Sequence, residues 1–318
     1  MNLLLLFILG SIWGTSFLFI KIVVGEVPPM TLVAGRLGLA ALTMWAFLRL
    51  RGVPFPRERR LWGIFAITGL LNGALPFTLI SWGEQYIPSG LAALLQSTTP
   101  IFTVILAHFL TRDDRFTAKK VLGIVLGFVG VGLLMWPELR GGLQASVWGQ
   151  FAIVGSSISY AIASIFARER LHDQPPLVSA AGQFTMGFVY ILPLSLLVER
   201  PFNLSPSWTA LASWATLALL GTVVAYAIYY VLLQRSNATF TTTVTYIVPI
   251  NGLILGALIL DEHIHTGLLI SLGLILSGIL LVRIKGDDKR VQPNLAKVGA
   301  PGSLEPSQGQ EKVECKMN

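Results

Sequence analysis

The sequence predicts an all-α integral membrane protein with ten transmembrane helices, arranged as two inverted five-helix repeats. Three observations lead to this prediction. Hydrophobic residues make up 53% of the 318 residues and charged residues only 12%, against about 25% charged residues in soluble proteins. The apolar runs are about 20 residues long, which is the length that a helix needs to cross a bilayer. Features of the first half also recur in the second half at a nearly constant spacing.

The apolar runs predict helices rather than the strands of a β-barrel, because barrel strands alternate in polarity over about ten residues. The predicted spans are residues 3–24, 29–49, 61–82, 88–111, 118–136, 147–167, 177–198, 208–231, 238–260 and 266–284. Proline marks several connections, among them Pro28, Pro54 and Pro137. We expect a first repeat at 1–136, a second at 147–284, and a polar tail at 285–318 that is disordered and cytoplasmic.

The basic residues predict the orientation. Arg140 and Arg200 are the basic residues of one set of alternate loops, whereas the other set carries sixteen. Because cytoplasmic loops are enriched in Lys and Arg, we expect a multi-pass protein of the cell inner (plasma) membrane with both termini in the cytoplasm. The sixteen are Arg49, Arg51, Arg57, Arg59, Arg60, Arg112, Arg115, Lys119, Lys120, Arg168, Arg170, Arg235, Arg283, Lys285, Lys289 and Arg290. The first residues lack a basic segment and a cleavage site, which favours an uncleaved first span.

Matched positions in the two halves indicate an internal repeat. Trp13 corresponds to Tyr160 at an offset of 147, and Pro100 corresponds to Pro249 at an offset of 149. Five spans per half is an odd number, so the second half must enter the membrane in the opposite orientation, which predicts an inverted-topology repeat. Four G-xxx-G pairs, which begin at residues 10, 69, 123 and 252, predict close helix contacts.

Two proline-centred stretches predict the substrate pathway. Pro100 in span 4 and Pro249 in span 9 lie at matching depths, each close to polar side chains. Polar clusters and helix breakers at equal depths in two halves indicate a transporter site near the midplane. Aromatic side chains within the spans could complete a cage around a substrate. The candidate substrate-binding residues are Trp13, Arg36, Gln96, Thr99, Pro100, Tyr160, Gln183, Tyr226, Tyr230, Thr245, Tyr246 and Pro249.

Arg36 lies about seven residues into span 2, too deep to reach water at the helix end. A charge at that depth faces the bundle interior or a wet cavity. Two roles stay open: Arg36 sets the electrostatics of the pathway or binds an anionic substrate group, or it ties backbone carbonyls and helix ends together. No carboxylate lies at the midplane, so proton coupling is not evident. Glu262 and Asp113 are expected to cap or pair at helix ends.

Other classes of function find little support. The sequence contains no G-x-S-x-G, H-E-x-x-H or P-loop motif, so an enzyme is not expected. Cys315 is the single cysteine, which excludes a disulfide framework and a thiolate metal cluster; we expect no metal and no cofactor. Loop residues explain the net charge of +7, so no nucleic acid is expected. The expected partners are a small-molecule substrate and the lipid bilayer, and a homodimer contact through the weakly polar spans 5 and 10 stays open.

Several short motifs, taken in order, resemble the EamA family of the drug/metabolite transporter superfamily. They are I-W-G at 12–14 with a following lysine, a proline and an arginine in span 2, the run S-G-L-A-A-L at 89–94 leading to Thr99-Pro100, and Pro249 followed by Glu262 in the second half. The resemblance covers residues 1–284. Asp113 stands where the family carries a glutamate after span 4, and Gln183 stands in place of a second span-2 arginine.

The resemblance implies an inner-membrane carrier, often an exporter of amino acids, metabolites or toxic compounds. With the repeats and paired prolines, it predicts a secondary active transporter that exports small metabolites such as amino acids by alternating access. An uncoupled channel or facilitator for small polar solutes is the alternative. Saturable counterflow of a labelled solute distinguishes the two.

Overall fold

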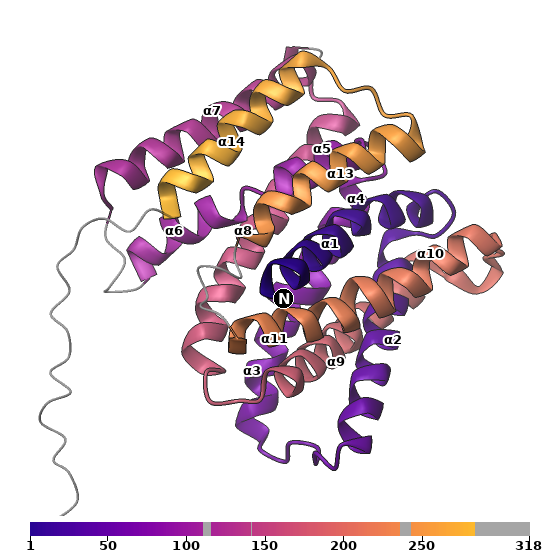
Figure 1. The fold of residues 1–318 in the computed structure, drawn as a ribbon. Coiled ribbons are helices and arrows are strands. Elements are labelled where there is room, and N and C mark those ends of the chain that lie inside the picture. The colour runs from indigo at the N-terminus through magenta and orange to yellow at the C-terminus, as the bar shows by residue number, and fades with distance from the viewer. Residues whose placement is uncertain (111–115, 141, 236–242, 284–318) are drawn as a thin grey trace, which may run out of the picture. The chain divides into compact units, whose positions relative to one another are not determined.

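The computed structural model describes residues 1–110, 116–140, 142–235 and 243–283, and within these ranges it contains helices and no strand, which confirms the all-α class (Figure 1). The helices are α1 (Asn2–Val24), α2 (Pro29–Leu50), α3 (Arg59–Gly69), α4 (Leu75–Gly83), α5 (Ser89–Gln96), α6 (Thr99–Leu110), α7 (Ala118–Arg140), α8 (Ala145–Arg170), α9 (Pro176–Leu194), α10 (Trp208–Ala218), α11 (Ala225–Arg235), α13 (Val244–Leu260) and α14 (Thr266–Arg283). Nine segments of the described chain are long and apolar enough to span a membrane, and α13 is a shorter apolar helix. The first residues of predicted span 9, the predicted tail and Asp113 lie outside the described residues.

Two spans contain a π-helical turn near their middle. The segment η1 (Leu70–Ala74) joins α3 to α4, and η4 (Leu219–Val224) joins α10 to α11. The two segments begin 149 residues apart, and their sequences are LLNGA and LLGTVV. A third π-helical segment, η2 (Ser195–Glu199), ends the span that begins with α9, and the short 3₁₀ helix η3 (Pro201–Asn203) follows it. Single π-helical turns within membrane helices often mark functional positions because they re-aim side chains.

The prolines do not all interrupt helices as expected. Span 4 is broken at residues 97–98, directly before Thr99 and Pro100, so the break expected there is confirmed. Pro249 lies inside the continuous helix α13, and the expectation of a helix breaker at this position is wrong. Pro137 also lies inside α7, which continues to Arg140 instead of ending near residue 136. Proline removes only one backbone hydrogen bond, and surrounding helices can hold a helix together across that gap.

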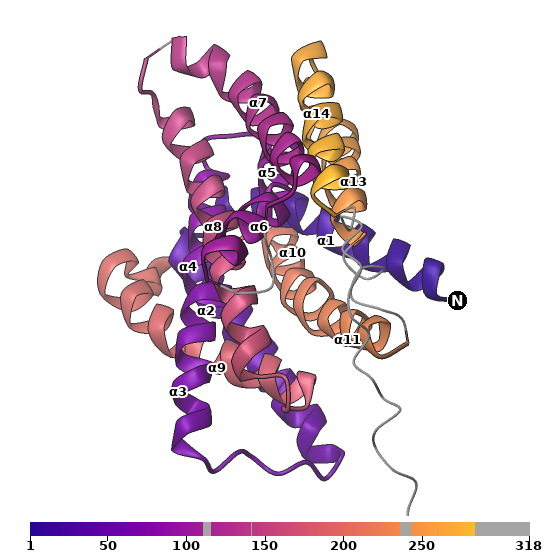
Figure 2. The same ribbon diagram turned by 90° about the vertical axis from the view of Figure 1, so that its left-hand side faces the viewer.

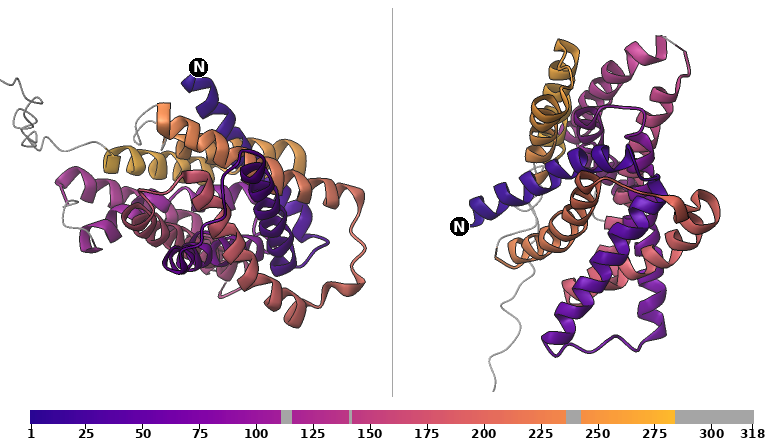
Figure 3. Two further views of the ribbon diagram at one scale, coloured as in Figure 1. Left: turned by 90° about the horizontal axis from the view of Figure 1, so that it is seen from below. Right: turned by 90° about the vertical axis from the view of Figure 1, so that its right-hand side faces the viewer.

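Close helix contacts centre on glycines. α1 lies between α13 on one side and α10–α11 on the other (Figure 1). A Cβ on Gly14 would lie 2.9 Å from the carbonyl oxygen of Val248, so α1 and α13 can approach this closely only because residue 14 has no side chain. α7 and α14 pack along each other, with Gly123 against Gly278, and they stay adjacent in Figures 2 and 3. The contacts predicted from the G-xxx-G pairs at 10 and 123 are therefore confirmed.

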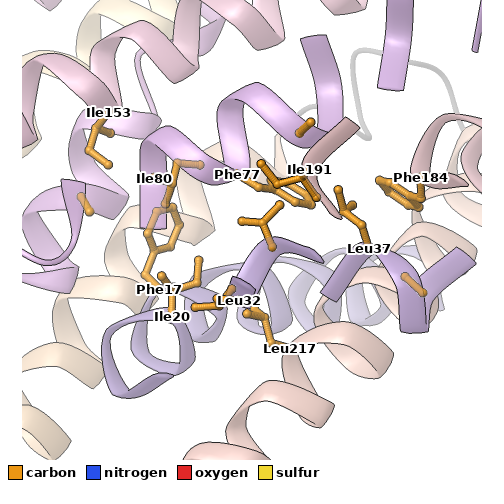
Figure 4. Close-up of a cluster of buried hydrophobic side chains, with 14 of the residues drawn as sticks. Phe17, Ile20, Leu32, Leu37, Phe77, Ile80, Ile153, Phe184, Ile191 and Leu217 are labelled. Atoms are coloured by element: carbon orange, nitrogen blue, oxygen red, sulfur yellow. The ribbon is translucent and has the colours of Figure 1, made fainter. Parts of the chain in front are cut away.

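A continuous apolar core connects the two halves of the chain. α2 packs against α9, and α4 packs against α8. Because lipid is as apolar as these side chains, dense packing rather than burial from water holds such helices together. Figure 4 shows core side chains from these helices and their neighbours: Phe17, Ile20, Leu32, Leu37, Phe77, Ile80, Ile153, Phe184, Ile191 and Leu217. Phe184 and Leu37 are fully buried, and both lie close to the polar residues described below.

One end of the bundle, formed by residues 24–31, 84–90, 199–207 and 260–262, is here called the glutamate end. Three glutamates cap helix N-termini there: Glu26 caps α10, Glu199 caps α2 and Glu262 caps α5. The hydrogen bonds run from Ser207 N and Oγ to Glu26 (both 2.6 Å), from Met30 N (2.9 Å), Thr31 N (2.7 Å) and Thr31 Oγ1 (2.7 Å) to Glu199, and from Ser89 N (2.6 Å) and Gly90 N (2.9 Å) to Glu262. A carboxylate at a helix N-terminus satisfies free N–H groups and favours the helix dipole. The role expected for Glu262 is therefore confirmed.

Candidate functional site

Arg36 is the charged centre of the candidate site. It is buried in α2, with 5% of its surface exposed. Its Nε donates a hydrogen bond to Thr222 Oγ1 at 3.0 Å, and its guanidinium carbon lies 3.9 Å from the ring centre of Phe77. In the described part of the chain, no carboxylate lies within ion-pair distance of Arg36. The structure therefore confirms that Arg36 faces the interior, and it leaves the cation without an acidic partner there.

Aromatic rings from four helices surround this centre. Trp13 of α1 contacts Tyr226 and Tyr229 of α11, with ring centres 6.2 and 5.7 Å apart. Tyr160 of α8 meets Phe77 edge-on at 6.3 Å. Four of these rings, those of Trp13, Tyr160, Tyr226 and Tyr229, are only partly buried. They form a wall that could contact the apolar part of a small molecule, because aromatic faces combine a large apolar surface with attraction for cations.

A second set of polar groups lies beside the aromatic wall. Asn72 Nδ2 donates to Gln183 Oε1 at 3.0 Å and lies 3.4 Å from the hydroxyl oxygen of Tyr226. Phe184 meets the Tyr226 ring edge-on at 5.1 Å, which connects these groups to the core. Gln183 is buried in α9, while Asn72 is partly exposed. Amide and hydroxyl groups of this kind can orient a polar substrate without carrying a charge.

The candidate site includes residues that the sequence analysis did not single out: Asn72, Phe77 and Thr222. Asn72 and Thr222 lie in the two π-helical segments, whose extra residue per turn directs these side chains toward Gln183 and Arg36. The offset of 149 that relates Pro100 to Pro249 also aligns LLNGA with LLGTV. A polar residue beside a glycine, in the middle of an apolar span and in both halves, was therefore a usable signal.

Gln96 and Thr99 form a separate polar cluster at the break between α5 and α6. Gln96 Nε2 donates to Thr99 Oγ1 at 3.0 Å, and the Ser156 hydroxyl of α8 donates to Gln96 Oε1 at 2.5 Å. Thr99 Oγ1 also donates to the backbone oxygen of Gln96 at 2.8 Å, so the side chains satisfy groups freed by the break. Pro100 follows in the first turn of α6 and is partly exposed.

Two of the predicted residues of span 9 contact Arg283, the last residue of α14. Arg283 donates to Thr245 Oγ1 at 2.8 Å, and its guanidinium carbon lies 5.0 Å from the ring centre of Tyr246. Pro249 is buried within α13. The structure thus places Thr245 and Tyr246 beside the end of α14, whereas α13 as a whole packs against α1 and α5. The side chain of Tyr230 lies outside the described residues.

Buried side chains close the bundle between the site and the glutamate end. Toward the glutamate end, polar side chains are almost inaccessible: Ser81 is 1% exposed, and Glu84 and Ser89 are 0% exposed. Lys21 Nζ donates to the backbone oxygens of Glu84 (2.5 Å) and Ile87 (2.9 Å) and closes the same end. The aromatic wall, by contrast, is partly accessible. The site is therefore sealed from the glutamate end in this conformation.

Residues 1–136 and 147–284 both match the model of the EamA-like transporter family. The chain belongs to the EamA-like transporter family. The resemblance expected from the sequence motifs is thus confirmed, and the chain is a multi-pass membrane transporter of the EamA type.

Similar proteins from bacteria agree with this membership. The uncharacterized transporter YoaV of Bacillus subtilis (strain 168) is 25% identical over 272 residues, which cover 85% of this chain and 92% of YoaV. The uncharacterized inner membrane transporter YedA of Escherichia coli (strain K12) is 28% identical over 280 residues, covering 88% and 89%. A probable amino-acid metabolite efflux pump of the same strain is 29% identical over 266 residues, covering 81% and 86%.

The fold also resembles that of a solved crystal structure. That structure superimposes with a TM-score of 0.63 at 21% sequence identity, covering 88% of this chain and 95% of the other. At this level of identity the likeness concerns the helical fold alone. It agrees with the helix arrangement described above.

Proposed function

We propose that this protein is a secondary active transporter that exports small, carboxylate-bearing metabolites, such as amino acids or related compounds, across the inner membrane by alternating access. The observation that carries the proposal is Arg36, a buried cation beside an aromatic wall with no described carboxylate as its partner. A buried charge is expensive unless something pairs with it. A substrate carboxylate would supply that partner, and guanidinium binds carboxylates through two parallel hydrogen bonds.

The aromatic wall supports a substrate that also has an apolar body. Trp13, Tyr160 and Tyr226 surround the polar centre, and Asn72 and Gln183 could bind a second polar group. An amino acid or related metabolite presents this combination of a carboxylate, a polar group and a side chain. The name of the similar E. coli efflux pump points to the same class of compound.

We further propose that the two halves form inverted repeats around this site. Arg36 and Gln183 are 147 residues apart, and each binds the π-helical segment of the opposite half, through Thr222 and Asn72 respectively. The contact of α1 with α13 has a counterpart in that of α8 with α6. The contact between α4 and α8 likewise corresponds to the contact between α11 and α1. Contacts matched in this way support a pseudo-twofold relation.

Aromatic contacts support the same relation. Trp13 and Tyr160 are 147 residues apart, and Phe77 and Tyr226 are 149 residues apart. Trp13 contacts Tyr226, and Tyr160 contacts Phe77. The repeat is not electrically symmetric, because Gln183 stands where the first half has Arg36. One cationic position in an otherwise paired site suits a substrate with a single carboxylate.

The basic loops set the orientation that we propose. The glutamate end faces outward, and both termini lie in the cytoplasm, because the opposite set of alternate loops carries sixteen basic residues, whereas the set on the side of the glutamate end carries Arg140 and Arg200. The conformation described here is then closed to the outside. An exporter needs such a state to load substrate from the cytoplasm.

Counterflow in proteoliposomes tests the proposal. Vesicles containing the full chain are loaded with an unlabelled mixture of protein amino acids and diluted into a radiolabelled mixture of the same compounds. A carrier accumulates label transiently and saturably, whereas a channel shows neither behaviour. We expect Arg36→Gln to reduce accumulation strongly at low substrate concentration, and Arg49→Gln, an exposed position on the same helix, to retain it. Equal accumulation by wild type and Arg36→Gln would remove Arg36 from the site.

A further inference from the structure

Glu84 is a buried carboxyl group that the site described above does not use. It follows α4 directly, and 0% of its surface is exposed. Neither of its carboxyl oxygens has a hydrogen-bond partner in the structure. Lys21 reaches this region, but its ammonium group binds the backbone oxygens of Glu84 and Ile87. A buried carboxylate without a partner is strongly disfavoured, whereas a neutral carboxyl group at the same place costs far less.

The charges around Glu84 do not remove this preference. Burial raises the pKa of Glu84 well above its ordinary value; Lys21 of α1 opposes that shift, Glu262 at the end of α13 adds to it, and Arg36 of α2 opposes it weakly. α8 supplies the neutral Gln150 at this end, and its buried amide also lacks a partner. The raised pKa means that the folded protein binds this proton more tightly than the unfolded chain does.

Glu84 lies between the outside and the candidate site. A hollow of about 320 Å³ opens at the glutamate end and is lined by Lys21, Gln85, Tyr86, Ile87, Pro88, Leu260 and Glu262. Glu84 directly precedes Gln85 of this lining and is itself fully buried. Seven residues earlier, and so on the same face of the span, is Phe77, whose ring contacts the Arg36 guanidinium. A rearrangement that opened the glutamate end would expose Glu84 to water before it exposed Arg36 to water.

We propose that Glu84 is a proton-binding site that couples closure of the glutamate end to proton uptake. The inference rests on the alternating-access part of the proposed function. With the end open, water reaches Glu84 and the carboxylate is stable. A proton from the hollow converts it to a neutral carboxyl group, which can then be buried as the end closes. In an exporter, the proton then enters from outside while the substrate leaves, so the two cross the membrane in opposite directions.

Infrared spectroscopy tests the protonation. The full chain in lipid nanodiscs is titrated, and the carbonyl stretch of protonated carboxyl groups is followed in wild type, Glu84→Gln and Glu26→Gln. Glu26 is a matched control, because it lies at the same end, is exposed, and has a pKa lowered by hydrogen bonds from Ser207. We expect a protonated band at neutral pH in wild type and Glu26→Gln that is missing in Glu84→Gln. A band that is absent from wild type, or unchanged in Glu84→Gln, overturns the inference.

Cysteine accessibility tests the coupling without any substrate. In a Cys315→Ser background, Ser81→Cys places a thiol at a buried position of α4 next to the glutamate end, and exposed Gln85→Cys serves as the reference for the intrinsic pH dependence of maleimide labelling. If one proton controls closure, the normalised labelling rate rises by about tenfold per pH unit between the pKa of Glu84 in the open state and its higher pKa in the closed state. Glu84→Gln, which resembles the protonated form, should keep the rate low at every pH.

Ser89→Cys, at a second fully buried position, repeats the measurement if Ser81→Cys does not fold. The same rise with pH in Glu84→Gln, or no rise in wild type, overturns the coupling. Failure of amino-acid counterflow with these two results intact refutes the proposed substrate class instead. The proton site and the substrate proposal can therefore fail separately.

Discussion

Replacement of Glu199 by alanine measures how strongly the glutamate end fixes the helix that carries Arg36. Glu199 accepts hydrogen bonds from Met30 N at 2.9 Å and from Thr31 N and Oγ1 at 2.7 Å each. Loss of an N-terminal cap costs about 0.5–2 kcal/mol, and a hydrogen bond to a charged group contributes about 1.5–3 kcal/mol. Water can replace some of the lost hydrogen bonds, because the Glu199 side chain is partly exposed. We therefore expect Glu199→Ala to lower the free energy of unfolding by about 2–4 kcal/mol.

The assay is reversible unfolding in mixed detergent micelles, followed by the fluorescence of the 8 tryptophans. Glu199→Gln keeps an acceptor oxygen but loses the charge, so about half of the effect is expected. Glu169→Ala removes an exposed carboxylate near the end of α8 and should change stability by less than about 0.5 kcal/mol. If Glu199→Ala costs no more than Glu169→Ala, the capping argument is refuted.

Three further predictions concern packing, pH and the site. Gly123→Ala should destabilise the protein in the same micelle assay, because its Cβ would lie 2.5 Å from a backbone oxygen of α14, whereas Gly132→Ala on the same helix meets no atom within 4 Å and should be neutral. The lowered pKa of Glu26 contributes stability above the ordinary carboxyl pKa, and this stability is lost as the pH falls through the lowered value; Glu26→Gln should flatten that acidic loss in unfolding midpoints measured against pH. Thr222→Val removes the hydroxyl that binds Arg36. We expect amino-acid counterflow to fall by a larger factor than any loss of folded protein explains, as parallel flux and unfolding measurements would reveal.

The helices could largely be predicted from the sequence, because the length and apolar content of a span depend on local composition. Their interruptions were less predictable. Pro100 follows a break while Pro249 does not, although both occupy matching positions. The difference depends on neighbours: at the break in span 4, Thr99 binds the backbone oxygen of Gln96 and Ser156 binds its side chain, whereas α13 packs against glycines of α1. Tertiary contacts of this kind cannot be read from the residues around a proline.

The candidate site could be predicted from the sequence where a single charged residue stands within an apolar span. Arg36 stands out as a charge deep within an apolar span, and the offset of 147 pointed to Gln183. Asn72 and Thr222 were missed because their directions depend on π-helical turns, which shift the side chains away from the positions of a regular helix. Thr245 was placed in the site on depth alone, but depth does not say which face of α13 it occupies.

The central claim is that Arg36 binds the carboxylate of the substrate, and a competition measurement tests it most directly. L-Phenylalanine and phenethylamine share an aromatic body and an amine, and only the first has a carboxylate. In wild-type proteoliposomes, we expect L-phenylalanine to inhibit counterflow of the labelled amino-acid mixture and phenethylamine to be far weaker. We expect Arg36→Gln to weaken L-phenylalanine inhibition by about ten- to a hundredfold, since a charged hydrogen bond contributes about 1.5–3 kcal/mol. Equal inhibition by both compounds, or undiminished inhibition in Arg36→Gln, would contradict the account.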